Sequence, residues 1–440
     1  MAPKSKGTKI NAFPTKEFFI EMLVRDVDLI PAIIDLIDNC SDGVIREKGD
    51  KDYSGYRVHI DADDHEFKIS DNCGGIGIAL ARDCAFRFGK TPSAEILKHS
   101  VGRAGIGMKR ALFKMGNHFI VDSTTRNSHF KIDVKVDEWR KDEDNWNFDW
   151  KEIDEEKHDE KEVGTRIEIS ELYEGVSQDL ALPPVISQIK DEIKIRHREI
   201  IEKGLEIKLN QFILSSVPAV LHESTKIRSA HRYNQWQTKT GKKVKVNIYT
   251  GIGKSVPADA GWYVYCNGRL VLESDQSAVT GWSELSEPAM PKYHNQFSRF
   301  RGYLFFDGDD PATLPWNTSK TGIDEGNEIY RKAKLEMTEM MRPVIDFLNA
   351  VDAEKDIPEG KRPLEELLKK TEPKEISTIS ILRDFKCPKS VSASREANTK
   401  IRYERSSRKV ERAKKILGVR SAKEVGEKTF DIFYKESGEE

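Results

Sequence analysis

The sequence predicts an α+β protein whose first domain is a two-layer α/β sandwich, and three observations support this prediction. Apolar residues recur at helical spacing between Phe18 and Ile37. Alternating strand patterns follow at residues 56–60, 67–70, 118–125, 129–136 and 165–172. Glycine clusters at residues 74–77 and 102–107 interrupt these patterns and predict tight loops. Helices followed by alternating strands and glycine-rich loops are typical of a two-layer α+β domain.

The length of 440 residues predicts more than one domain. We expect the first domain at residues 1–185 and a second α/β domain at residues 186–350. Strand patterns at 245–253, 261–272 and 301–306, followed by a helix at 325–348, support the second domain. Residues 351–395 are rich in Lys, Glu, Pro and Ser without clear periodicity and are interpreted as a linker. Residues 396–440 are expected to form a small C-terminal module.

The composition excludes a membrane-spanning protein. Hydrophobic residues make up 38% and charged residues 33% of the chain, which describes a globular protein with a heavily charged surface. No apolar run approaches the roughly 18 residues of a membrane span, and the first residues lack the apolar core of a signal peptide. We therefore expect a cytoplasmic protein. Five cysteines without a CxxC pair predict reduced thiols and no zinc knuckle.

A polar helix face is the first candidate site. Asp35, Asn39 and Asp42 stand at i, i+4 and i+7, so a helix aligns two carboxylates and an amide along one face. Magnesium keeps several of its waters, so one oxygen from Asn39 together with substrate phosphates is enough to hold it. The alternative is a solvated helix face with a cap-like end.

Two glycine-rich segments are the next candidates. In the segment Asp71–Gly77, Gly75 and Gly77 allow the backbone to lie against a flat ligand, and the Asp71 carboxylate is placed to accept the exocyclic amine of adenine. A plain turn is the alternative. The segment Gly102–Ala111 passes from a glycine loop into a helix, whose free N–H groups favour phosphate oxygens. Gly164 and Thr165 open a strand and carry a weaker signal.

In their order and spacing these four segments resemble the nucleotide-binding motifs of the GHKL superfamily, which includes gyrase, chaperone, histidine-kinase and MutL ATPases. The resemblance covers residues 15–175 and implies a Bergerat-type ATP-binding domain with ATP and Mg2+ as ligands. It implies that Asn39 binds the magnesium, that Asp71 and Thr165 hold adenine, that Gly75 backs it, and that Asp35 is the general base. The implied phosphate lid contains Gly102, Gly105, Gly107, Met108 and Lys109.

Two residues depart from the family pattern. Asp35 stands where the family usually has Glu, and its side chain is one methylene shorter, so the attacking water must lie closer or turnover is slower. Because aspartate also occurs at this position in bacterial relatives, we expect a working base. Cys73 stands at the first glycine of the DxGxG motif, which puts the tight-turn geometry in question but leaves Asp71, Gly75 and Gly77 in place.

The second domain carries two further resemblances. The strand Cys266–Val271, with Asn267, Gly268 and Arg269, is similar to the NGR strand of the S5-like transducer domain in MutL, type II topoisomerases and Microrchidia (MORC) proteins. The segment Leu314–Ile323 resembles the MORC loop that sends a lysine, here Lys320, to the γ-phosphate. The alternative for Lys320 is an ordinary surface lysine.

These resemblances imply a slow Mg-dependent ATPase of the MORC or MutL type that acts as an ATP-driven clamp, as a homodimer or with a partner protein. Bacterial proteins of this kind often act in DNA transactions or anti-phage defence. The chain shows no phospho-acceptor histidine box, which argues against a histidine kinase. A scaffold that binds ATP without hydrolysing it is the alternative function.

The C-terminal module is predicted as a strand at residues 400–404, a helix at 408–417, and a second helix that begins with a capping box at Ser421 and Glu424. This pattern resembles the ribbon-helix-helix fold. Between Arg395 and Arg420 ten basic residues face three acidic ones, so DNA is a candidate partner. A solvated basic helix and a dock for an acidic protein are the alternatives.

Overall fold

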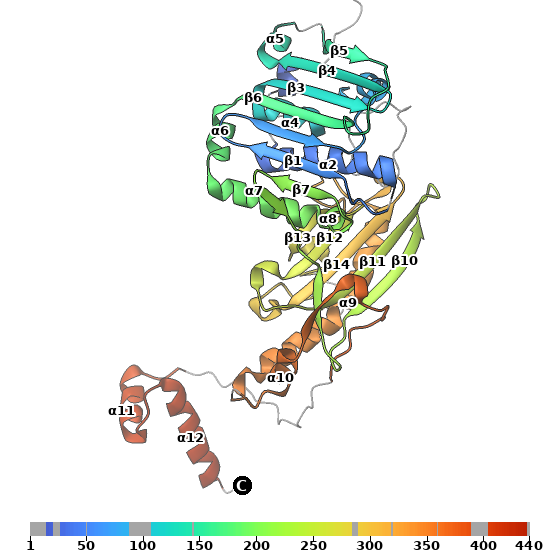
Figure 1. Ribbon diagram of the computed structural model, residues 1–440. Helices are drawn as coiled ribbons and strands as arrows, with labels where there is room; N and C mark the ends of the chain where they lie inside the picture. The colour runs from blue at the N-terminus through green and yellow to red at the C-terminus, as the bar shows by residue number, and fades with distance from the viewer. Residues whose placement is uncertain are drawn as a thin grey trace, which may run out of the picture. The chain divides into compact units, whose positions relative to one another are not determined.

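A computed structural model describes residues 15–20, 27–49, 51–87, 107–142, 145–283, 289–317, 320–358, 360–388 and 404–437. The chain divides into two compact units, Met1–Pro388 and Lys389–Glu440. The larger unit holds two sheets, which are taken in turn below (Figure 1).

The first sheet has eight strands in the order β5-β4-β3-β6-β2-β1-β7-β8. Each neighbouring pair is antiparallel except β1 and β7, which are parallel. The strands are β1 (Arg57–Ala62), β2 (Phe67–Asp71), β3 (Gly116–Thr125), β4 (Ser128–Lys135), β5 (Trp150–Asp154), β6 (Gly164–Leu172), β7 (Glu206–Leu209) and β8 (Phe212–Leu214). The five strand patterns predicted from the sequence for this domain correspond to β1, β2, β3, β4 and β6.

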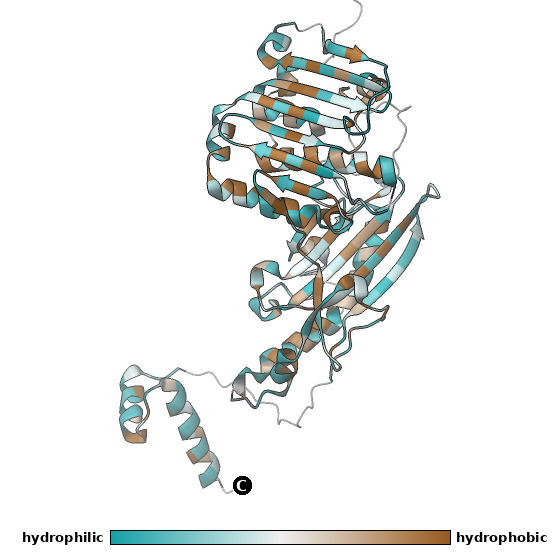
Figure 2. Ribbon diagram, in the orientation of Figure 1, coloured by the Kyte–Doolittle hydropathy of each residue, from teal (hydrophilic) through white to brown (hydrophobic). Residues whose placement is uncertain are grey.

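Helices α2 (Leu29–Lys48) and α4 (Gly107–Met115) lie against one face of this sheet (Figure 1). Ile33, Ile34 and Ile37 of α2 are fully buried there, because the helical spacing predicted from the sequence turns them toward the strands. Hydropathy alternates along the strands (Figure 2), and the opposite face carries polar pairs such as His118 with Asp133. The sandwich therefore has one covered face and one polar face.

The remaining helices of this part of the chain are short or lie beyond β6. They are α1 (Lys16–Phe18), α3 (Ile78–Leu80), the π-helix η2 (Ala81–Ala85), α5 (Val136–Lys141), α6 (Glu174–Leu180), α7 (Pro183–Arg196) and α8 (Arg198–Glu202). Helices α7 and α8 lead into β7 and β8, which complete the first sheet, and Leu214 still belongs to the first core. The predicted domain boundary at residue 185 is therefore wrong by about the length of this crossover, because a parallel β1–β7 pair needs a helical connection.

The second sheet has the order β13-β12-β14-β11-β9-β15, with β10 paired to β11. Its strands are β9 (Val220–Glu223), β10 (Ala230–Gln237), β11 (Lys243–Ile252), β12 (Gly261–Cys266), β13 (Arg269–Asp275), β14 (Phe300–Gly308) and β15 (Glu372–Glu375). The long helix α9 (Glu328–Ala353) packs on β11 and β14. Short 3-10 turns connect these elements: η3 (Pro257–Asp259), η4 (Ala278–Thr280), η5 (Asn295–Phe297), η6 (Pro311–Thr313), η7 (Glu354–Asp356) and η8 (Ile376–Thr378).

The prediction of a linker at residues 351–395 is wrong up to Pro388. This segment continues α9, forms α10 (Pro363–Lys369) and adds β15 to the edge of the second sheet beside β9. Leu364, Leu368 and Phe385 are buried. Their irregular spacing among charged residues hid this packing from a search for periodicity.

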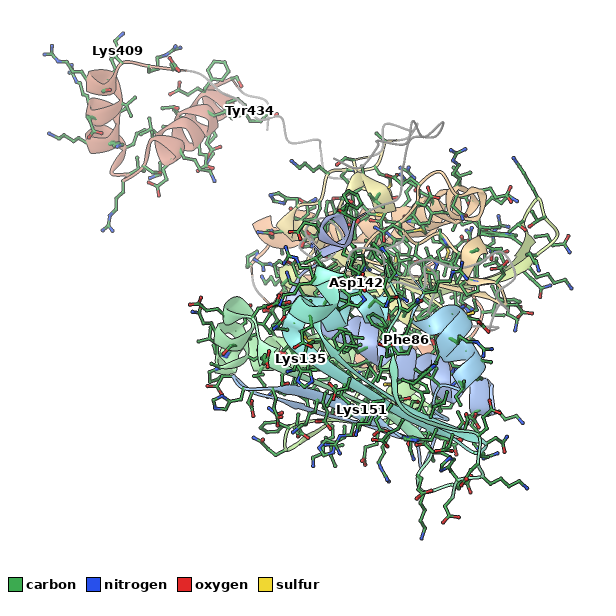
Figure 3. All side chains as sticks on the ribbon, turned by 90° about the horizontal axis from the view of Figure 1, so that it is seen from above. Phe86, Lys135, Asp142, Lys151, Lys409 and Tyr434 are labelled. Carbon is green, nitrogen blue, oxygen red and sulfur yellow. The ribbon has the colours of Figure 1, made fainter. Side chains whose placement is uncertain are left out.

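The C-terminal unit contains α11 (Ser407–Leu417) and α12 (Ala422–Glu436). The predicted capping box of Ser421 and Glu424 is present, and the predicted helix at 408–417 corresponds to α11. The predicted strand at 400–404 lies outside the described residues except for Glu404, which is not in a strand. Side chains such as Lys409 on α11 and Tyr434 on α12 project from these helices (Figure 3), and neither helix has a buried residue. Across the described ranges, no helix is long and apolar enough to cross a membrane.

Candidate functional site

Helix α2 supplies the first group of site residues. Its apolar residues point to the sheet, while Asp35 and Asp38 are buried on another side and Asn39 is exposed. The Asn39 side chain makes no hydrogen bond to any residue that the structure describes, so its amide oxygen is available to a ligand. Asp42, one turn further on, is half-buried. The predicted alignment of these residues along α2 is present.

Asp35 lies between two cations. Arg110 Nη2 is 3.4 Å from Asp35 Oδ2, and Lys320 Nζ is 3.4 Å from Asp35 Oδ1. Helix α4 begins at Gly107 directly beside this carboxylate, since a Cβ at Gly107 would stand 2.7 Å from Asp35 Oδ2. Glycine at this position therefore allows the start of α4 to approach the carboxylate.

Lys320 lies between β14 of the second sheet and helix α9. It is part of a loop that an isolated β-bridge between Trp316 and Ile323 closes. Trp316 is fully buried, and its indole N–H donates to the Pro311 carbonyl at 2.9 Å. The Lys320 backbone has a φ of +56°, a left-handed conformation that is costly for a residue with a Cβ. Its ammonium group donates to Asp38 Oδ2 at 2.7 Å, closer than to Asp35.

Asp38 is the centre of a buried charged cluster. Besides Lys320, it accepts hydrogen bonds from His197 Nε2 at 3.0 Å and from Arg269 Nε at 3.3 Å to Oδ2, and Arg269 Nε lies 3.1 Å from Oδ1. Burial alone would raise the pKa of Asp38, yet Arg269 and Lys320 lie so close that they hold it well below its usual range. Burial lowers the pKa of His197, so this ring is neutral and donates through Nε2. The cluster is thus one carboxylate shared by two cations and a neutral imidazole.

Asp71 stands at the end of β2, opposite Thr165 on β6. Its carboxylate accepts the Cys73 N–H at 2.7 Å, and burial raises its pKa. Ser123 on β3 links the neighbouring parts: its hydroxyl lies 2.8 Å from Thr165 Oγ1 and accepts the Ile76 N–H at 2.9 Å. The sheet therefore brings together the two residues, Asp71 and Thr165, that the sequence assigned to adenine.

The loop between β2 and α3 depends on its glycines. Gly75 has a φ of +67°, and a Cβ there would lie 2.1 Å from the Thr124 carbonyl oxygen. Gly164, at the start of β6, leaves still less room, since a Cβ would lie 1.9 Å from the Asp71 carbonyl oxygen. Gly77 has an ordinary φ and nothing within 4 Å of a Cβ, so space is open beside it. Cys73 has no positive φ, and the tight turn therefore tolerates this departure from the family pattern.

The predicted phosphate lid is only partly described. Gly102 and Gly105 lie outside the described residues. Met108 and Lys109 are buried, and Lys109 Nζ donates to the Ala85 carbonyl at 2.6 Å. Burial lowers the pKa of Lys109 to about 7. The structure thus does not bring Lys109 to the Asp35 side of the site, whereas its neighbour Arg110 is there.

Sequence reasoning missed Asp38, Arg110 and His197, and it gave Arg269 no role beyond the NGR motif. The one available signal for Asp38 was its position, because it is a charged residue next to Asn39 within an otherwise apolar stretch of the predicted helix. Its partners His197, Arg269 and Lys320 stand 159, 231 and 282 residues away, so no local spacing points to them. Such contacts arise only from the packing of segments that are far apart in the sequence.

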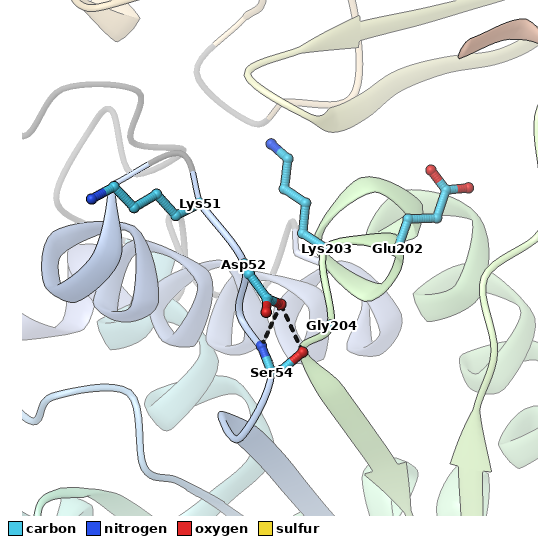
Figure 4. Close-up of a pocket in the computed structure, with 6 residues that line it drawn as sticks. All are labelled: Lys51, Asp52, Ser54, Glu202, Lys203 and Gly204. Atoms are coloured by element: carbon cyan, nitrogen blue, oxygen red, sulfur yellow. Dashed lines mark hydrogen bonds between the residues drawn. The ribbon is translucent and has the colours of Figure 1, made fainter. Parts of the chain in front are cut away.

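A shallow polar depression lies elsewhere on the first domain, between the end of α2 and α8 (Figure 4). In it, Asp52 Oδ1 accepts hydrogen bonds from the backbone N–H and hydroxyl of Ser54. The lining residues are Lys51, Asp52, Ser54, Glu202, Lys203 and Gly204. None of the candidate residues above belongs to this depression.

Residues 27–165 match a family model described as histidine kinase-, DNA gyrase B-, and HSP90-like ATPase. The matched range contains α2, the Asp71 loop, the start of α4 and Thr165, and ends before the second sheet. The match confirms the GHKL resemblance, and this part of the chain is a GHKL-type ATP-binding domain. The chain matches no curated protein.

Proposed function

We propose that this protein is a slow Mg-dependent ATPase of the MORC or MutL type, in which the bound nucleotide controls the contact between the first domain and the second. The observation that carries the proposal is Lys320, which reaches from beyond the second sheet's last long strand to within 3.4 Å of Asp35 on α2. A lysine at the predicted general base is where charge on a transferring phosphoryl group needs stabilisation.

The residues present fit a magnesium ion that is shared with a nucleotide. Asn39 offers an exposed amide oxygen on α2. The described parts of the chain contain no group of three or more His, Cys, Asp or Glu side chains that could hold a metal by themselves. Magnesium commonly binds through few protein oxygens and the substrate phosphates, and when bound it neutralises phosphate charge.

In the proposed reaction, Asp35 accepts the proton of a water whose oxygen attacks the γ-phosphorus, while the bond from that phosphorus to the ADP oxygen breaks. Lys320 stabilises the negative charge on the transferring group. Asp71 and Thr165 hold the adenine ring at the other end, against the backbone of Gly75.

A second candidate function is an ATP-dependent scaffold without hydrolysis. Arg110 and Lys320 each lie 3.4 Å from a different oxygen of the Asp35 carboxylate, so both oxygens already have a cationic partner in the place that an attacking water would need. The shorter aspartate side chain favours the same outcome.

Phosphate release from ATP separates the two candidates. Asp35→Ala and Lys320→Ala are expected to bind ATP, measured by calorimetry, yet release phosphate on the order of a hundredfold more slowly than wild type. Lys334→Ala is the matched control, because Lys334 is also a lysine of the second domain but pairs with Glu325 at 3.3 Å. Wild-type ATP binding without phosphate release supports the scaffold, and full activity of Lys320→Ala removes Lys320 from the reaction.

A further inference from the structure

Three segments that are far apart in the sequence meet at the Asp38 carboxylate. His197 follows α7, Arg269 begins β13, and Lys320 lies in the loop closed by Trp316 and Ile323. Asp38 itself is 1% exposed, so a bound substrate cannot touch it. Its effect on any reaction must pass through the side chains that it holds.

We propose that Asp38 is the positioning residue of the site: its carboxylate docks the Lys320 loop and Arg269 of the second domain onto α2 and thereby places the Lys320 ammonium beside Asp35. Where it concerns phosphate, this inference rests on the proposed function. The docking itself is a property of the ligand-free chain.

The distances identify Asp38 as the main partner of Lys320. The Lys320 ammonium is 2.7 Å from Asp38 and 3.4 Å from Asp35, so the contact with Asp38 is the shorter one. The left-handed backbone of Lys320 is unfavourable by itself and persists only where its surroundings fix it. The buried ion pair is such a constraint.

Removing the Asp38 charge would leave Arg269 and Lys320 as two buried cations without their shared carboxylate. Uncompensated buried charges are strongly unfavourable, so the side chain with a route to solvent is expected to leave. Lys320 lies in the loop between Trp316 and Ile323, outside the strands of the sheet, whereas Arg269 is the first residue of β13 and pairs with Cys266 of β12. The loop of Lys320 is therefore the part that moves.

The same cluster contains more positive than negative charges, and this net positive charge is available to an anionic ligand. Asp35 and Asp38 face Arg110, Arg269 and Lys320, so two carboxylates oppose three cations, and His197 adds no charge. An anionic phosphate next to Asp35 balances this surplus. Docking at Asp38 thus couples phosphate binding beside Asp35 to the contact between the two domains.

The first test needs no nucleotide. Asp38→Asn keeps the shape of the side chain and removes its charge. Hydrogen exchange is expected to be on the order of tenfold faster at the Lys320 loop, where the amides of Asn317, Lys320 and Asp324 donate to Gly322, Asn317 and Pro315, than in wild type. The amides of β14 in the same domain should be unchanged. Unchanged exchange at the loop overturns the proposal.

Asp133→Asn is the matched control. Asp133 is likewise a carboxylate shared by a lysine, Lys151, and a histidine, His118 at 2.7 Å, but it lies on the polar face of the first sheet. This variant should leave both the exchange of the Lys320 loop and the turnover of ATP at wild-type values.

The second test is a double-variant cycle of ATP turnover with Lys320→Met. If Asp38 acts through Lys320, Asp38→Asn lowers kcat on the order of thirtyfold with KM little changed, and the double variant is no slower than Lys320→Met alone. Multiplied effects in the double variant overturn the proposal. If wild type binds ATP without turnover, the proposed ATPase fails, and hydrogen exchange still decides whether Asp38 docks the loop.

A milder variant covers the case in which Asp38→Asn does not fold. His197→Gln keeps a donor for Asp38 but changes its reach, and it leaves every charge in place. It is expected to raise exchange at the Lys320 loop about threefold, with no further loss of turnover once Lys320 is Met. A loop indifferent to both variants rules out docking through Asp38.

Discussion

The end of the site around Asp71 and the end around Asp35 draw their residues from different distances along the chain. Asp71, Ser123 and Thr165 stand on three strands of one sheet, and hydrogen bonds between neighbouring strands fix their spacing. Asp35 instead meets Lys320, which lies 285 residues further along, in the part of the chain that carries the second sheet.

Under the proposed function, this difference separates binding from turnover. The residues assigned to adenine all lie on the first sheet, so the proposal expects nucleotide binding there without the second sheet. The contact between Lys320 and Asp35 joins the parts of the chain that carry the two sheets, so the proposal expects turnover to depend on that contact. Such an ATPase would act as a switch, because only one of the two steps depends on the contact.

The largest expected effect is at the Asp71 end. Asp71→Asn replaces an acceptor by an amide whose N–H2 opposes the adenine amine, and the mismatch is expected to cost about 3 kcal/mol, or roughly a hundredfold in Kd for ATP. Calorimetry with magnesium measures it, and wild type should prefer ATP to GTP. Asp61→Asn, on the exposed part of β1, is the control. Equal affinity of wild type and Asp71→Asn would remove Asp71 from the adenine site.

The second prediction concerns Lys109, which the sequence placed with the phosphates and the structure places in the core. Its pKa of about 7 when folded lies below its ordinary value of 10.5, because burial disfavours the charge. Between these values the unfolded chain binds a proton that the folded chain does not, so stability rises with pH in this window. Below and above this pH window, the contribution of Lys109 to the free energy of unfolding does not change with pH.

Urea unfolding of wild type and Lys109→Met at several pH values measures this contribution. Wild type should gain about 2 kcal/mol relative to Lys109→Met between pH 7 and pH 9. Lys114→Met, a lysine on the same helix that is only half-buried, is the control for replacing a lysine of α4 by Met. Parallel curves for wild type and Lys109→Met would mean that Lys109 is not buried in solution.

The same contrast explains what the sequence could predict. The strands, α2 and the Asp71 loop follow from periodicity and glycine spacing, which are local properties. The Asp38 cluster, the extension of the first sheet to β8 and the packing of residues 363–388 all depend on contacts between distant segments. Lys109 shows the limit most plainly, since a charged residue at a helix start has the same local pattern whether it faces a phosphate or a buried carbonyl.

A smaller effect is expected at Asn39 on α2. If its amide oxygen holds magnesium, Asn39→Ala should weaken ATP binding about tenfold with magnesium present and hardly at all in EDTA. Asn72→Ala is the control. The Asn72 side-chain amide already donates to the Gly55 carbonyl and accepts the Arg57 N–H, so it is not available to a metal. Equal losses with and without the metal would assign Asn39 to the nucleotide itself.

The smallest expected effect on ATP binding comes from the C-terminal unit, which is the part of the chain farthest in the sequence from both Asp71 and Asp35. The C-terminal helices bury no residue of their own, and Ile416, Phe430 and Phe433 are more than half exposed. So short a unit gains stability by pairing with another surface. Its helix α11 is also strongly basic, which suits a polyanion.

Deleting residues 396–440 should therefore leave the Kd for ATP unchanged while removing dimerisation, DNA association or partner binding. Light scattering, salt-dependent DNA binding and co-purification measure the three losses.

Two variants of the full chain separate their causes: Phe430→Ala with Phe433→Ala removes apolar contacts, and Arg412→Gln with Lys415→Gln removes charge from α11. Loss of the oligomer in the first pair alone indicates a protein partner, because apolar pairing does not depend on the basic side chains. Loss of DNA binding in the second pair alone, with a reduced salt dependence, indicates phosphate contacts. A truncated protein that keeps its oligomeric state, its DNA binding and its partners would show that the module serves none of these roles.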